Sequence, residues 1–343
     1  NTQNIDSNSD PLEIDVMRIN KSGGKVVMNQ NLDVAKTEDP LIFSTVNSFL
    51  DLNGNDLTIG ENNVSSTVTY NGGSFIGNTS SNLTLKGDGD FGDLILESAN
   101  NNLGTFTIDR QNSGSVTLPN SINISTQLNI ASGSLVMNSN TLLYVNGNID
   151  NDGNITFKSD ANGSAQLDIF SGSITGTGDV TVERFIPAGD NSLRAFRFLS
   201  TAVDSNGTIF DDWQEGGNSP AGFGTHITGT DLGTGKGFDD SGSGNPSLLV
   251  FDNTATPNSD GWSFIDNTNN TSLEAGKGYN LFVRGDRGVD LFPGSTPQTP
   301  TNTTLRSTGT LATGSLTTGT DLPVLADGTD EFSFIGNPYQ AIV

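Results

Sequence analysis

The chain has 343 residues, of which 32% are hydrophobic and 16% charged, and 42 are glycine. A typical domain has about 100 to 200 residues, so this length excludes one small domain. The 39 acidic residues outnumber the 15 basic residues and give a formal net charge of −24. That charge repels phosphate backbones and anionic headgroups, so nucleic acid is not an expected partner.

The chain has no cysteine, which excludes disulfides, thiolate nucleophiles and cysteine-ligated metal sites. No stretch approaches the roughly 18 apolar residues of a membrane-spanning helix, so direct membrane insertion is not expected. The N-terminus lacks the charged and apolar parts of a signal peptide, and the C-terminus follows an apolar run directly. We therefore expect both ends to be cuts in a longer protein.

Short apolar runs with a period of two recur from about residue 12 to residue 182 and predict β-strands. Examples lie at residues 83–85, 106–108 and 155–157. Glycine or asparagine interrupts almost every stretch that could otherwise form a helix. The expected fold class is therefore all-β, with almost no helix.

Self-comparison reveals internal similarity in the first half of the chain. Residues 17–28 resemble residues 106–118, and residues 49–59 resemble residues 135–145. These offsets are about 90 residues, but strands return about every 10 residues, so about 20 residues could form one coil of a β-solenoid. Glycine and asparagine suit its tight corners because they tolerate positive φ. We predict a solenoid over residues 1–183; the alternative is a pair of β-sandwiches of about 90 residues each.

Composition changes after Glu183. Both tryptophans and most of the prolines and aromatic residues lie beyond it. Aromatic strand-like runs at residues 247–251 and 279–283 are separated by long polar loops, a pattern typical of an antiparallel sandwich. We predict a β-sandwich-like domain over residues 184–343, truncated at its C-terminus.

Two groups of motifs carry a family resemblance. The first is the glycine- and asparagine-rich phrase at residues 52–60 and 172–180; the second runs through residues 182–188, 194–200, 212–216, 224–229, 282–287 and 334–339. Together they resemble secreted cell-surface proteins of Bacteroidota, particularly flavobacteria, that leave through the type IX secretion system. The resemblance implies an extracellular or cell-surface location and an adhesive or structural role, and it does not imply a catalytic site. In that family the Gly-Asn-Pro-Tyr segment is usually followed by more sequence and a C-terminal sorting domain.

Two loops place oxygen ligands close together, with glycine permitting a sharp turn, as Ca²⁺ requires. One contains Asp88, Asp90 and Asp93, and the other contains Asp150 and Asp152. Neither is a full EF-hand, because the bidentate glutamate at the twelfth loop position is lacking. Calcium is therefore the candidate cofactor. The alternative is that both loops are solvated turns rich in aspartate and asparagine and bind no metal.

A sugar-binding or glycosidase site would need carboxylates near an aromatic platform. Asp211, Asp212 and Glu215 beside Trp213 form the best such cluster, with an edge loop anchored by its tryptophan as the structural alternative. His226 is the sole histidine, and no Gly-x-Ser-x-Gly elbow accompanies it, so we expect a structural role for it.

Arginines are unusual in so acidic a chain, and we single out five of the six that lie in the second half. We expect them to pair with carboxylates and fix strands, with a ligand site as the alternative; they are Arg184, Arg194, Arg197, Arg284 and Arg287.

The leading hypothesis is a non-enzymatic extracellular structural or adhesive surface protein. An uncapped solenoid end would expose unpaired backbone groups and favour self-association into fibres. Surface glycans or other cells are the further expected partners. The competing hypothesis is a carbohydrate-binding or polysaccharide-degrading module of a surface enzyme.

Overall fold

The computed structural model describes residues 2–35, 38–188, 194–230, 235–292 and 299–341. Strands account for 45% of the chain, and no α-helix occurs among the described residues. No helix in this part of the chain is long and apolar enough to cross a membrane. The chain divides into two compact units: residues 1–157 with 165–179, called the solenoid unit here, and residues 158–164 with 180–343, called the second unit.

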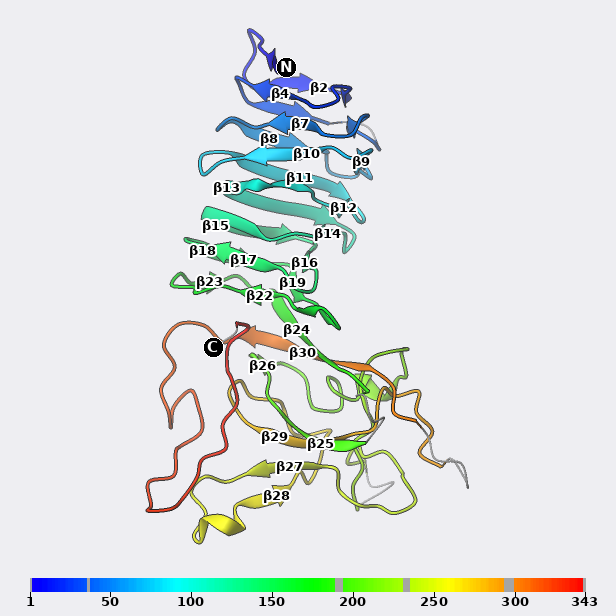
Figure 1. Ribbon diagram of the computed structural model, residues 1–343, viewed down its shortest axis with the longest axis vertical. Helices are drawn as coiled ribbons and strands as arrows, with labels where there is room; N and C mark the ends of the chain where they lie inside the picture. Colours follow the sequence, from blue (N-terminus) through cyan, green and yellow to red (C-terminus); the bar gives the residue numbers. More distant parts are fainter. Residues whose placement is uncertain (1, 36–37, 189–193, 231–234, 293–298, 342–343) are drawn as a thin grey trace. The chain divides into compact units, whose positions relative to one another are not determined.

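The solenoid unit is a stack of about eight turns, each running through up to three short strands (Figure 1). The first four turns contain β1 (Thr2–Ile5), β2 (Leu12–Ile14), β3 (Met17–Ile19), β4 (Gly24–Met28), β5 (Leu32–Val34), β6 (Leu41–Phe43), β7 (Ser48–Asp51), β8 (Asp56–Ile59), β9 (Val68–Tyr70), β10 (Ser74–Gly77), β11 (Asn82–Asp88) and β12 (Gly92–Asp93). The next four contain β13 (Leu96–Gln111), β14 (Ser115–Leu118), β15 (Ile122–Ser132), β16 (Ser134–Met137), β17 (Leu142–Val145), β18 (Asn148–Asn151), β19 (Asn154–Phe157), β22 (Gln166–Leu167) and β23 (Ile174–Thr175).

Strands of successive turns pair in parallel and form the faces of the solenoid. One face follows the order β1, β4, β7, β10, β13, and another follows β2, β5, β8, β11, β13. The third face contains β3, β6 and β9 in the early turns and β12, β14, β16 and β19 in the later ones. The long strands β13 and β15 bend across two faces, since each pairs with two different strands of a neighbouring turn.

Inward-facing apolar side chains stack from turn to turn. The register places one column of buried residues behind the second face: Leu32, Leu57, Leu83, Phe106, Leu128 and Ile149. Each of them is at most 1% exposed. The alternation of strands sends the next residue of each run outward, so a single period-two pattern builds both the core and the polar surface.

Corners of the solenoid use asparagine and glycine as the sequence predicts. Asn53 and Gly54 have φ of 51° and 83°. The Asn53 and Asn55 side chains both donate to the carbonyl of Met28 in the preceding turn, at 3.1 and 2.9 Å. At Gly60, an added Cβ would lie 2.4 Å from the Lys86 carbonyl oxygen, so only glycine fits. Corner residues therefore both turn the chain and tie neighbouring turns together.

The second unit contains two antiparallel sheets and a short hairpin. One sheet joins β24 (Asp179–Ile186), β30 (Thr303–Leu311) and β26 (Val203–Ser205); the other joins β25 (Ala195–Leu199), β29 (Tyr279–Val283), β27 (Leu248–Phe251) and β28 (Trp262–Phe264). The hairpin pairs β20 (Ser159–Asp160) with β21 (Gly163–Ser164). Single 3₁₀ turns occur at Glu215–Gly217 and Asn258–Asp260.

Both sheets of the second unit contribute to one apolar core. Ile186 and Leu305 come from the first sheet, and Leu248, Tyr279 and Leu281 come from the second. The predicted fold class, a solenoid followed by an antiparallel sandwich-like domain, is confirmed, and the alternative of two sandwiches in the first half is wrong.

Candidate functional site

The loop between β11 and β12, which the sequence marks as a calcium candidate, surrounds an arginine. Arg110, from the next turn of the solenoid, is 0% exposed. Its guanidinium donates to the carbonyl oxygens of Lys86, Asp88 and Gly89. It also lies 5.7 Å from the centre of the Phe91 ring. The backbone oxygens of this loop are thus already occupied by a cation from the chain itself.

Burial lowers the pKa of Arg110, and the charges of Asp88 and Asp90 oppose that shift. Neither carboxylate bonds to the guanidinium directly. Asp88 Oδ2 instead accepts from Asn112 at 3.0 Å, and Asp90 Oδ1 accepts from the Ser115 amide at 2.9 Å. Asp93 is exposed on β12. Asp88 and Asp90 therefore lie near a guanidinium of the chain itself, whereas Asp93 is exposed on the strand that follows.

The second calcium candidate lies along β18 and the corner that follows it. Asp150 Oδ1 accepts from the Thr175 hydroxyl at 3.0 Å, and Asp152 Oδ1 accepts from the Thr177 amide at 3.0 Å. Both bonds join neighbouring turns. Across the described ranges, no group of three or more histidine, cysteine, aspartate or glutamate side chains is placed to hold a metal ion.

Trp213, the sugar-stacking candidate, is a core residue. Its side chain is 2% exposed, its ring meets Tyr279 edge-on at 5.3 Å, and its Nε1–H donates to the Ser307 hydroxyl at 3.2 Å. With both faces packed, the ring is not available to a sugar in this structure. The structural alternative, an aromatic anchor that fixes its own loop, describes the observed packing.

The carboxylates around Trp213 are bound by their own chain. Asp211 Oδ2 accepts from the Thr208 hydroxyl at 2.7 Å, and Glu215 forms an ion pair with Arg306. Asp212 is 8% exposed and accepts from the Ser205 hydroxyl at 2.5 Å. Burial raises the pKa of Asp212 to about 6 against these hydrogen bonds, with a smaller contribution from the neighbouring acidic charges.

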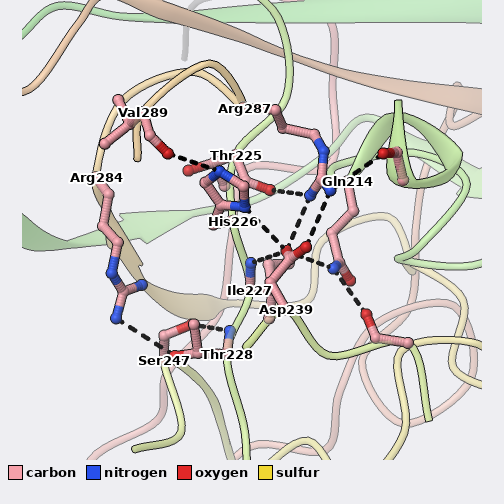
Figure 2. A network of polar contacts seen from close by, with 12 residues as sticks. Gln214, Thr225, His226, Ile227, Thr228, Asp239, Ser247, Arg284, Arg287 and Val289 are labelled. Atoms are coloured by element: carbon pink, nitrogen blue, oxygen red, sulfur yellow. Dashed lines mark hydrogen bonds and ion pairs between the residues drawn. The ribbon is translucent and has the colours of Figure 1, made fainter. Parts of the chain in front are cut away.

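A network of polar contacts in the second unit centres on Asp239 (Figure 2). Arg287 donates to both carboxylate oxygens at 2.9 Å, and Gln214 and the Ile227 amide each donate to Oδ2 at 3.0 Å. Burial alone would raise the pKa of Asp239, but His226 and Arg287 outweigh it and hold the pKa well below its ordinary value. The carboxylate is therefore ionised and fixed.

His226 joins this network from the other side. Its Nε2 lies 3.0 Å from the Val289 carbonyl oxygen, which can only accept, so Nε2 carries a proton. Its Nδ1 lies 3.4 Å from Asp239 Oδ2, longer than a good hydrogen bond. The ring is 12% exposed and bonds to no serine among the residues that the structure describes. The structural role expected for the sole histidine agrees with this geometry.

Asp239 and Gln214 were not singled out from the sequence. Asp239 belongs to a stretch rich in glycine, serine and aspartate, which reads as a solvated loop. Only the presence of Arg287 in an acidic chain hinted at a buried partner. Arg287 makes the carboxylate pair expected of it, whereas no such pair occurs for Arg184, Arg194, Arg197 or Arg284 within the described ranges.

An open depression crosses the early turns of the solenoid. Its lining includes the carboxylates of Glu13, Asp33 and Glu61, together with Lys86. The described lining residues include no aromatic side chain. Paired carboxylates are thus present without the aromatic platform that the carbohydrate hypothesis also expects.

The first turn of the solenoid presents open strand edges. In the described part of the chain β1 pairs only with β4, β2 only with β5, and β3 only with β6. The Leu12 amide donates to Asn31 and the Met17 amide to Pro40, both in the second turn. Since parallel ladders alternate, the backbone groups of Asn4, Glu13 and Arg18 point away from that turn. Among the described residues, these three edges face no further strand.

Comparisons with protein-family models, with curated proteins and with solved structures found no match to this chain.

Proposed function

We propose that this chain is a non-enzymatic structural or adhesive protein of the cell surface, whose solenoid associates with a second copy through its first turn. The observation that carries the proposal is the row of edges on β1, β2 and β3 that pair with no further strand among the described residues. Short parallel edges with unpaired N–H and C=O groups pair readily with another chain. The resemblance to exported Bacteroidota surface proteins supports the extracellular location.

Charge at this end sets the conditions for association. Asp6, Asp10, Glu13 and Asp15 all lie in or beside the first turn. Pairing of two first turns brings these like charges together. Salt at 0.1 M screens the repulsion between charges that are more than about 10 Å apart. Association is therefore expected to strengthen with ionic strength, as suits an acidic protein in a salty medium.

The use of titratable groups in the second unit also supports a structural role. Asp239, Glu215 and Asp212 each bind donors of their own chain. These bonds join segments far apart in the sequence, such as Glu215 with Arg306 and Asp212 with Thr308. Bonds of this kind connect the long loops of a scaffold that has no cysteine to cross-link it.

Carbohydrate binding is the second candidate, and one surface favours it. On the sheet of the second unit, the register aligns Phe198, Asn280, Leu249 and Phe264 in one row across all four strands. Phe198 is 70% exposed and Phe264 is 54% exposed. Exposed rings on a flat sheet offer a platform for an apolar ligand face.

Sedimentation of the full chain over a range of protein and salt concentrations tests the leading proposal. We expect reversible association that increases with salt. Glu13→Pro removes an outward N–H of an edge strand without breaking a bond to the second turn, so it should weaken association. Asn129→Ala on an inner turn is the control. A chain that stays monomeric at every concentration and salt level contradicts the proposal.

A further inference from the structure

Two arginines stand at adjacent positions on the ends of neighbouring strands. β25 and β29 are antiparallel, and their last rung joins Ala195 to Val283. Arg194 precedes that rung and Arg284 follows it, so the two are the next residues on either strand. Alternation places both on the side of Phe196 and Phe282. Like charges directly opposite one another in an antiparallel pair are destabilising.

The lowered pKa of Arg284 is consistent with a second positive charge nearby. Burial lowers its pKa most, and the charge of Arg194 lowers it further. Its side-chain bonds are long and neutral, at 3.4 Å to the Phe282 carbonyl and 3.3 Å to the Thr228 hydroxyl. Figure 2 shows Arg284 directed toward Thr228 and away from Asp239. Asp239 itself is held by Arg287 through both carboxylate oxygens.

No carboxylate of the described residues forms an ion pair with Arg194 or Arg284, although the chain has 39 acidic residues. Two arginines at facing positions of adjacent strands, with no carboxylate bound to either among the described residues, have donors that match the two oxygens of a carboxylate. An anion bound between them would remove the mutual repulsion and satisfy those donors. The arrangement thus has the charge and the donors of an oxyanion site.

The surroundings restrict the ligand. Phe196 is 50% exposed and its ring lies 5.1 Å from that of Phe282, on which the Arg284 guanidinium also rests at 4.8 Å. A ligand seated at the two arginines therefore also meets an apolar ring. The net charge of −24 repels polyanions at long range, so a single negative charge is favoured.

We propose that Arg194 and Arg284 form an oxyanion subsite for a ligand that carries one carboxylate next to an apolar face, which contacts Phe196. Two sources share this chemistry: a free monocarboxylate, and an isolated uronic acid on an otherwise neutral glycan. The second source deepens the proposed adhesive role and rests on it. The subsite itself is independent of association through the first turn.

The first test is the stability of Arg194→Gln in buffer that contains chloride as its only anion. Removing one of two opposed charges should raise the melting temperature of the second unit, followed by tryptophan fluorescence. Arg184→Gln, which changes an exposed arginine on β24, is the matched control and should have no effect. A melting temperature that is unchanged or lower in Arg194→Gln overturns the proposal.

The second test is titration of the full chain with methyl glucuronide, acetate and methyl glucoside, followed by NMR signals of the arginine Nε–H groups. Methyl glucuronide should shift the Arg284 signal in the wild type and in Arg184→Gln, and should bind at least tenfold more weakly to Arg194→Gln. Tighter binding of methyl glucuronide than of acetate assigns the uronic acid source, and equal binding assigns a free carboxylate. Equal binding of neutral methyl glucoside, or no binding by either carboxylate, overturns the subsite.

These outcomes are separate from those of the sedimentation experiment. A chain that binds methyl glucuronide yet stays monomeric keeps the subsite and loses the proposed association. A chain that associates but binds no carboxylate loses only the subsite.

Discussion

Arg287 and Asp239 form a two-point ion pair in the second unit, with both nitrogen–oxygen distances at 2.9 Å. The Arg287 side chain is 5% exposed and that of Asp239 is 16% exposed. The same guanidinium donates to the carbonyls of Asn218 and Thr225. This pair therefore fixes several loops that lie outside the named strands.

Asp239→Asn should destabilise the second unit by about 3 to 5 kcal/mol, because it leaves the buried Arg287 charge without a counter-charge. Urea unfolding followed by tryptophan fluorescence measures this unit alone, since both tryptophans lie in it. Asp266→Asn is the control, because Asp266 is 89% exposed in its pair with Lys236 and should cost at most about 1 kcal/mol. Equal losses in the two variants would contradict the structural role of Asp239.

Asp212 predicts a dependence of stability on pH. Its folded pKa of about 6 lies above the unfolded value of about 3.9, so the folded state binds its proton more tightly. Its unfavourable contribution is fully present above pH 6 and disappears below about pH 4, a change of about 3 kcal/mol. Asp212→Asn should remove that change. Denaturant midpoints of the second unit from pH 4 to pH 7 measure it, and identical profiles for variant and wild type would refute it.

Arg110→Met should destabilise the solenoid by about 3 kcal/mol or more, because three loop carbonyls lose their donor. Hydrogen exchange at residues 86–93 should increase in the variant, and circular dichroism during urea unfolding gives the energy. Lys86→Gln, whose carbonyl remains available, is the matched control. A loss below about 1 kcal/mol would show that water replaces the guanidinium easily.

Calcium is expected to leave the wild-type chain unchanged. The carbonyl oxygens of Asp88 and Gly89 already bind Arg110, and Asp90 Oδ1 accepts from the Ser115 amide. Melting curves with millimolar CaCl₂ should match those with NaCl at equal ionic strength. A saturable rise in melting temperature that Asp88→Asn abolishes would establish a calcium site there.

Leu128→Ala should cost about 2 to 5 kcal/mol, because it opens a cavity in the stacked column between Phe106 and Ile149. The adjacent Asn129 faces outward, and Asn129→Ala should change stability by at most about 0.5 kcal/mol. Urea unfolding of the solenoid unit compares the two. Similar losses at both positions would contradict the assigned inward register.

The sequence predicts the solenoid well because its determinants are local. Each strand carries its own period-two pattern, and each corner carries its own glycine or asparagine, as at Asn53 and Gly54. The internal similarity with an offset of about 90 residues does not predict which face a segment occupies. Residues 17–28 form β3 and β4, whereas the matching residues 106–118 lie in β13 and β14 on different faces. Those segments share a strand–turn–strand corner.

The candidate sites depend on contacts between distant residues, which no local pattern reveals. The aspartates at residues 88–93 read as cation ligands, but the loop binds Arg110 of the following turn through its backbone carbonyl oxygens. Trp213 looks like a surface platform beside three carboxylates until the strand that carries Ser307 covers it. Arg287 and Asp239 likewise pair only because the fold brings together two loops that are 48 residues apart in the sequence.

Disulfide trapping tests the central claim, association through the first turn, most directly. The chain has no cysteine, so Asn4→Cys places a single thiol on the outward edge of β1. Ser263→Cys, exposed on β28, is the control. We predict that Asn4→Cys forms covalent dimers under mild oxidation at high salt, far faster than Ser263→Cys. Equal rates, or a persistently monomeric Asn4→Cys, would contradict association through this edge.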